Sequence, residues 1–179
     1  MDMMTGHLLS LWLIIIIQSL VIFYVIKVVK KVSEDANGLP PGNKFPNILN
    51  SNNLVNKEPL PDILFKNNDN VYFFVIEEEC KFCREIIPTV DYYKRTNAHV
   101  NIKFLVIGTD VSAKRLLSVS KHKFDYWLIH PENVVKRLKV RSFPFAFVVQ
   151  KDNFIIKRST INSKNFQRFM SSEVSEIAQ

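Results

Sequence analysis

The only two cysteines of this 179-residue chain, Cys80 and Cys83, follow closely after a stretch with the pattern of a buried strand. That stretch, "VYFFVIE" (residues 71–77), is almost continuously apolar and rich in β-branched and aromatic residues, as expected for a strand covered on both faces. From residue 82 to residue 95, apolar side chains recur at helical spacing. The sequence therefore predicts a strand that leads into a helix at the cysteine pair, and this junction constrains the fold more than any other feature.

Strand and helix patterns continue to alternate after this junction. Strand patterns occupy residues 100–109, 124–129, 144–150 and 154–160, and the last two are joined by a hairpin signal at residues 151–153. Helix patterns begin near residue 110, at residue 131 and at residue 163, the last running to residue 177. Asp110 or Ser112 is the expected N-cap of the first, and Pro131 lies in the first turn of the second. The order predicts an α/β fold with a central mixed sheet flanked by helices.

An apolar segment near the N-terminus is long enough to cross a membrane. Leu8 to Ile26 contains no charge, and the apolar pattern extends to Val29, whereas about 20 such residues span a bilayer core. A buried core helix is rarely apolar on every face for so long. A cleaved signal peptide fits less well, because no positive charge precedes the segment and no small-residue cleavage site follows it. We expect a retained transmembrane helix at about residues 8–29.

The chain then divides into three parts along the sequence. Residues 1–32 form the membrane anchor, residues 33–60 are an Asn- and Pro-rich linker and N-terminal extension, and residues 61–179 form the folded domain. An apolar share of 47% over the whole chain is enough for a packed core. The net charge of +7 is spread along the chain without a basic run, so it indicates a lysine-rich surface and not a nucleic-acid site.

Three kinds of chemistry compete for a lone Cys-x-x-Cys pair. A structural zinc site needs about four ligands, and the four histidines show no ligand spacing, so we expect no metal. A structural disulfide across so small a loop would constrain little of the unfolded chain. A reactive thiol pair remains, in which Cys80 attacks and Cys83, one turn inside, resolves. The helix N-terminus, Lys81 and Arg84 favour a thiolate at Cys80, and Glu77, Glu78 and Glu79 oppose it.

Two motifs give the chain a family resemblance. The run "VYFFVIEEECKFCREIIPTVDYY" resembles the thioredoxin-fold active site, including a proline, Pro88, five residues after the second cysteine. In "KVRSFPFAFVV", Pro144 after Phe143 is similar to the cis-proline loop that faces the cysteines in thioredoxin-like proteins. Together with the N-terminal anchor, the layout is most similar to membrane-anchored proteins of the MauD-like (methylamine-utilisation accessory) and TlpA/ResA type.

Two positions depart from the family pattern. Glu79 stands where a tryptophan commonly precedes the first cysteine, which alters the surface facing a substrate. Phe74 stands where thioredoxins carry a buried acid, and it cannot carry a proton for Cys83. Glu77 is a candidate substitute for that acid.

The resemblance implies a membrane-tethered thiol–disulfide oxidoreductase that acts on client proteins during their maturation. Cys80, Cys83 and Pro144 would form its site, supported by Glu79, Lys81, Phe82 and Phe143. It implies a redox-active Cys80–Cys83 disulfide in place of a cofactor, a partner that recharges this pair, and contact with lipid through the anchor. Alternatives are a thiol peroxidase of the same fold and a non-catalytic assembly or metallochaperone module.

The two indications of membrane orientation disagree. Lys27, Lys30 and Lys31 follow the apolar segment, and the positive-inside rule would place the domain in the cytoplasm. The resemblance implies the outer face of the cell membrane, where disulfides persist, and this is the location that we expect.

Overall fold

A computed structural model describes residues 3–35, 37–46, 70–150 and 152–171. The chain divides into two compact units, Met1–Ala36 and Asn37–Gln179. The first unit contains one helix, α1 (Met3–Asp35). Its segment Trp12–Val29 has a mean hydropathy of 2.4 and no buried residue, so α1 is long and apolar enough to cross a membrane. A signal sequence near an N-terminus has the same properties.

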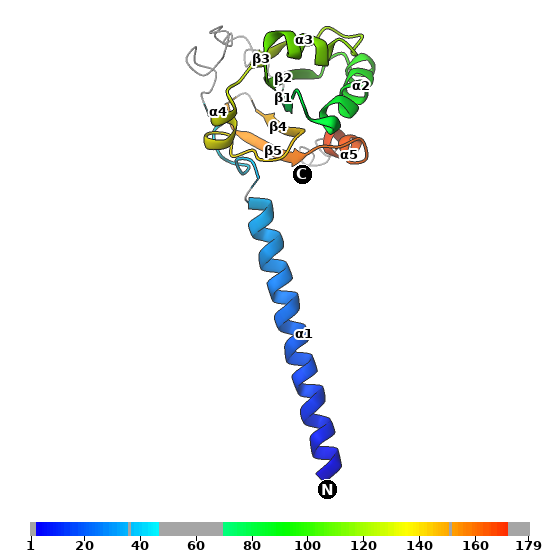
Figure 1. The fold of residues 1–179 in the computed structure, drawn as a ribbon, viewed down its shortest axis with the longest axis vertical. Helices are drawn as coiled ribbons and strands as arrows, with labels where there is room; N and C mark the ends of the chain where they lie inside the picture. The colour runs from blue at the N-terminus through cyan, green and yellow to red at the C-terminus, as the bar shows by residue number, and fades with distance from the viewer. Residues whose placement is uncertain (1–2, 36, 47–69, 151, 172–179) are drawn as a thin grey trace. The chain divides into compact units, whose positions relative to one another are not determined.

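The second unit is built around a five-stranded mixed sheet in the order β3-β2-β1-β4-β5 (Figure 1). Its strands are β1 (Val71–Glu77), β2 (Asn101–Ile107), β3 (Tyr126–Leu128), β4 (Phe145–Val149) and β5 (Ile155–Thr160). The strands β1, β2 and β3 are parallel, whereas β4 is antiparallel to both β1 and β5. The predicted α/β fold with a mixed central sheet is confirmed.

Both faces of the sheet are buried, because successive side chains of a strand point to opposite sides. Tyr72, Phe74 and Ile76 of β1 belong to the core on one face, which also contains residues of α2, α3 and α5. Phe73 and Val75 belong to the core on the other face, which includes residues of α4. The double burial explains why the β1 sequence is continuously apolar and does not alternate with polar residues.

The described residues of this unit also form four helices: α2 (Lys81–Thr96), α3 (Asp110–Leu117), α4 (Pro131–Lys136) and α5 (Phe166–Ser171). The predicted N-caps of α3, Asp110 and Ser112, are wrong. Thr109 is the N-cap, and it forms a capping box with Ser112. The last helix begins at Phe166 and not at residue 163, because the Asn162 side chain accepts backbone hydrogen bonds within a turn. The predicted residues 172–177 of this helix lie outside the described part.

The segment 37–46 packs onto the sheet. Phe45 is buried and its ring stacks on Phe73 at a centroid distance of 4.9 Å. Lys44 pairs with Phe154 in an isolated antiparallel bridge. The compact unit therefore starts at Asn37, whereas the sequence places the start of the domain near residue 61; residues 47–69 lie outside the described part.

Candidate active site

Cys80 is placed at the start of α2 by the end of β1. The strand ends at Glu77, whose carbonyl accepts the Cys80 N–H at 3.3 Å and closes a tight turn. Cys80 is the N-cap of α2, with extended backbone angles of φ −75° and ψ 111°. Its Sγ accepts the Cys83 backbone N–H at 3.2 Å. A negative charge on this sulfur would therefore be met by a donor at a helix N-terminus, as the sequence predicts.

Cys83 lies one turn further along α2 and is fully buried, with a relative exposure of 0%. Both cysteines are free thiols in this structure, and Cys80 is half-buried. Burial raises the pKa of the Cys83 thiol well above its ordinary value, and the hydrogen bond with Cys80 and the charge of Glu77 act in the same direction. Cys83 is thus held as a neutral thiol behind a more accessible Cys80.

The second motif of the sequence lies against the first. The Phe143–Pro144 peptide bond is cis, as the resemblance predicts. The Cys80 thiol donates to the Phe143 carbonyl oxygen, with an Sγ to O distance of 3.6 Å. Pro144 is buried at the start of β4, and its carbonyl accepts the Ile161 N–H at 2.9 Å. Two residues 63 positions apart in the chain, Cys80 and Phe143, therefore share one site.

The residues predicted to support the site differ in their exposure to solvent. Phe82, between the cysteines, is 60% exposed, and Glu79 is also exposed. Lys81 points to solvent and reaches Glu85 at only 3.9 Å. Phe74 is fully buried, and its ring neighbours are Phe104 and Phe166. The position of the usual buried acid is thus occupied by part of an aromatic core.

A group of polar contacts around Glu78, close to the cysteines, was not predicted from the sequence. The Arg115 Nη2 of α3 lies 2.7 Å from the Glu78 Oε1. Arg84 donates to the Glu78 carbonyl at 3.4 Å from the other side. These residues line a hollow of about 560 Å³, together with Ser112, Leu116 and Val119. No pattern in the sequence pairs Glu78 with Arg115, because they are 37 positions apart and belong to different elements.

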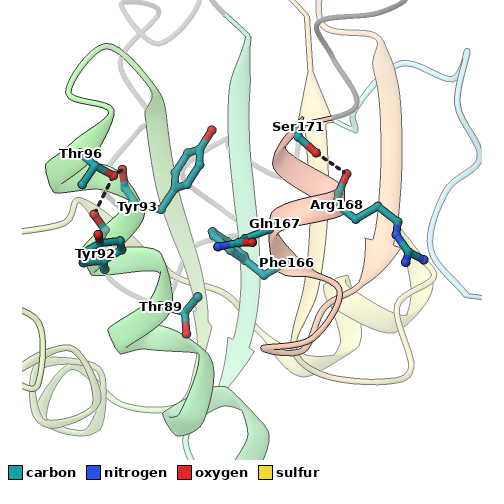
Figure 2. Close-up of a pocket in the computed structure, with 8 residues that line it drawn as sticks. All are labelled: Thr89, Tyr92, Tyr93, Thr96, Phe166, Gln167, Arg168 and Ser171. Atoms are coloured by element: carbon teal, nitrogen blue, oxygen red, sulfur yellow. Dashed lines mark hydrogen bonds between the residues drawn. The ribbon is translucent and has the colours of Figure 1, made fainter.

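A second hollow, of about 540 Å³, lies between α5 and the C-terminal half of α2 (Figure 2). Tyr92 and Tyr93 line it on the α2 side, and Phe166, Gln167 and Arg168 line it on the α5 side (Figure 2). Its lining residues include neither cysteine nor histidine. Within the described ranges, no group of three or more His, Cys, Asp or Glu side chains could hold a metal ion.

Comparison with known proteins identifies the architecture. No protein-family model and no curated protein match the sequence. Among solved structures, the thioredoxin domain of a thiol-disulfide oxidoreductase from Bacteroides vulgatus matches with a TM-score of 0.58 at 14% identity, covering 76% of this chain and 99% of that one. The chain has a thioredoxin-like fold.

Two further structures agree with this thioredoxin-like fold. A Chlorobium tepidum protein described as thiol:disulfide interchange protein DsbE has a TM-score of 0.58 at 14% identity, covering 76% of this chain and 96% of that one. A thioredoxin-like protein from Aeropyrum pernix has a TM-score of 0.55 at 10% identity, covering 83% of this chain and 98% of that one. Each match spans nearly the whole of the solved chain.

Proposed function

We propose that this chain is a membrane-tethered thiol–disulfide oxidoreductase that exchanges disulfides with client proteins. The observation that carries the proposal is the arrangement of three groups. Cys80 caps α2 and touches the Phe143 carbonyl ahead of Pro144, while Cys83 is buried directly behind it. An accessible sulfur with a donor, next to a buried second thiol, suits attack followed by resolution.

In the reducing direction, the Cys80 thiolate attacks one sulfur of a client disulfide. The client S–S bond breaks, a mixed disulfide to Cys80 forms, and the leaving client thiolate takes up a proton. Cys83 then loses its proton and attacks the Cys80 sulfur, which forms the Cys80–Cys83 disulfide and releases the client as a dithiol. Two electrons pass to the client, and the reverse sequence oxidises it.

The raised pKa of Cys83 makes its deprotonation the demanding step. Phe74 offers no proton acceptor on the strand beneath. Glu77 is half-buried at the end of β1, and its charge acts on the Cys83 thiol. In the proposed mechanism, Glu77 or the leaving client thiolate accepts the Cys83 proton.

The tether and the clients complete the proposal. We infer that α1 spans the membrane and holds the domain on its outer face, where clients acquire disulfides during maturation. This places the chain functionally with anchored proteins of the TlpA/ResA and MauD type. A separate redox partner recharges the Cys80–Cys83 pair after each cycle. Protease digestion of intact cells tests the location, because a protected domain would indicate a cytoplasmic reductase.

The activity is tested with the full-length protein in detergent micelles, reducing insulin with dithiothreitol as electron donor. We expect Cys80→Ser to lower the rate to that of dithiothreitol alone, and Cys83→Ser to turn over slowly because its mixed disulfide is not resolved. Wild type and Cys80→Ser with equal rates would overturn the proposal. Hydrogen peroxide consumption that is faster than insulin reduction would instead indicate a thiol peroxidase. A Cys80→Ala/Cys83→Ala variant that still supports client maturation would indicate a non-catalytic assembly module.

A further inference from the structure

The loop that carries Phe143 is held by hydrogen bonds to Asn37, a residue far away in the sequence. Asn37 is the first residue of the folded unit and follows Asp35, the last residue of α1, by two positions. Its side-chain Nδ2 donates to the Ser142 Oγ and, at 3.0 Å, to the Thr160 Oγ1. Its Oδ1 accepts the Arg141 backbone N–H at 3.0 Å. We call Asn37, Arg141, Ser142 and Thr160 the Asn37 cluster.

The cluster uses both donors and the carbonyl oxygen of one carboxamide group. Two N–H donors meet two hydroxyl oxygens, and one carbonyl oxygen meets a backbone N–H. The Ser142 and Thr160 hydroxyls are 3.2 Å apart, so they also bond to each other.

The backbone around Asn37 is held in the same place. Arg158 of β5 donates its Nη1 to the carbonyls of Asn37 and Gly38. The Gly38 N–H donates to the Lys139 carbonyl at 2.8 Å. Gly38 has φ +78°, and a Cβ at this position would overlap the ring of Phe145, the residue after Pro144. The segment therefore lies tightly against both sides of the Phe143–Pro144 bond.

We infer that Asn37 is a positioning residue for disulfide exchange: its side chain fixes residues 141–142, so that the Phe143 carbonyl stays against Cys80. The inference rests on the proposed function. The Phe143 carbonyl oxygen is 3.6 Å from the Cys80 sulfur, so the loop that carries it adjoins the atom that a client disulfide must reach. A protein disulfide brings its own backbone to this loop, whereas a small aromatic disulfide does not. Asn37 therefore acts on the binding of protein clients more than on the reactivity of the sulfur.

The test compares Asn37→Ala with Asn43→Ala in the full-length protein. Asn43 is a matched control, because it lies in the same segment and its Nδ2 donates to Pro40 O at 3.1 Å, away from the cluster. The probes are insulin, a protein disulfide, and 5,5′-dithiobis(2-nitrobenzoic acid), a small disulfide. For Asn37→Ala we expect the KM for insulin to rise about tenfold, the equivalent of losing one ordinary hydrogen bond. We expect kcat and the small-disulfide rate to stay within about twofold, and Asn43→Ala to match wild type throughout.

Two further measurements separate positioning from general stability. Hydrogen exchange at the Arg141 amide should accelerate in Asn37→Ala and stay unchanged in Asn43→Ala. The effects of Asn37→Ala and Ser142→Ala on KM should be non-additive, since both residues belong to one cluster. A merely structural role would lower both disulfide rates together, and that result overturns the inference while the proposed function stands. A wild-type protein that does not reduce insulin would overturn both.

Discussion

Cys80, the N-cap of α2, and Cys83, in its first turn, are three residues apart, but their surroundings differ. The surface around Cys80 contains the exposed Phe82 and Glu79, and it adjoins the Phe143 carbonyl. The interior around Cys83 is an apolar core that includes Phe74, Ile76 and Ile86. One helix terminus thus gives two identical side chains different surroundings: the first sulfur is partly exposed, whereas the core buries the second and raises its pKa.

Phe74 is buried and Phe82 is exposed, so their substitution should show the largest difference, which is one of stability. Phe74→Ala should lower the free energy of unfolding by about 3–5 kcal/mol, because a fully buried ring would leave a cavity. Phe82→Ala removes the same atoms from the surface and should change the free energy of unfolding by less than about 0.5 kcal/mol. Urea denaturation of the two full-length variants measures both values. Equal losses would show that the interior around Cys83 is not the packed core described above.

The thiols should differ in reactivity by a smaller but still large factor. In the folded protein we expect iodoacetamide to alkylate Cys80 at least about a hundredfold faster than Cys83, because the reactive species is an accessible thiolate. Between about pH 7 and about pH 9, Cys83 should stay almost entirely protonated because of its raised pKa, so its modification should remain much slower than that of Cys80 at both pH values. Peptide mass spectrometry after timed quenching reads out both sites. Modification of both cysteines at similar rates would remove the distinction between the two regions.

Asp91 is also buried on α2, but its pKa is lowered, whereas the pKa of Cys83 is raised. Burial alone would raise the pKa of this carboxyl, but hydrogen bonds from Ser120 and the His122 N–H, together with the Arg95 charge, lower it overall. The Ser120 Oγ and the His122 nitrogen lie 2.6 and 2.7 Å from Oδ1, and the Arg95 Nε lies 3.1 Å from Oδ2. Burial therefore does not set the direction of a shift by itself; the partners do.

Removing the charge of Asp91 should have the smallest of the three effects, a modest loss of stability that depends on pH. A folded-state pKa below the unfolded one stabilises the protein above about pH 4, and that contribution is lost as the pH falls through the folded value. Asp91→Asn should cost about 1–3 kcal/mol at neutral pH, because buried donors lose a charged acceptor. It should also flatten the decline in stability below about pH 4. Urea midpoints from pH 7 to pH 2 test this, and an unchanged acid profile would contradict it.

Local features of the site were predictable from the sequence. The strand, the two cysteines and the start of α2 are consecutive, so apolar periodicity and capping position Cys80 without tertiary information. Pro144 was predicted through its resemblance to a known loop. The N-cap of α3 was not, because Thr109 and Asp110 are adjacent residues with similar capping preference.

Polar contacts between segments that are distant in the chain could not be predicted, because no sequence pattern marks them. Asn37 and Ser142 are 105 positions apart, and Glu78 and Arg115 are 37 positions apart. A single asparagine in an Asn-rich segment has no periodicity that marks it, and its partners are defined only once β4 and β5 are in place. The packing of Phe45 was missed for the same reason, since one aromatic residue among prolines and asparagines is not a strand or helix pattern.

Trapping of a mixed disulfide shows which of the two cysteines attacks a client disulfide. Full-length Cys83→Ser, Cys80→Ser and wild-type proteins are mixed with a peptide that contains one disulfide, acid-quenched and weighed by intact mass spectrometry. The account predicts that Cys83→Ser accumulates a peptide adduct on Cys80, that Cys80→Ser accumulates none, and that the wild type passes to the Cys80–Cys83 disulfide. An adduct that accumulates in Cys80→Ser and not in Cys83→Ser would reverse the two roles and contradict the account.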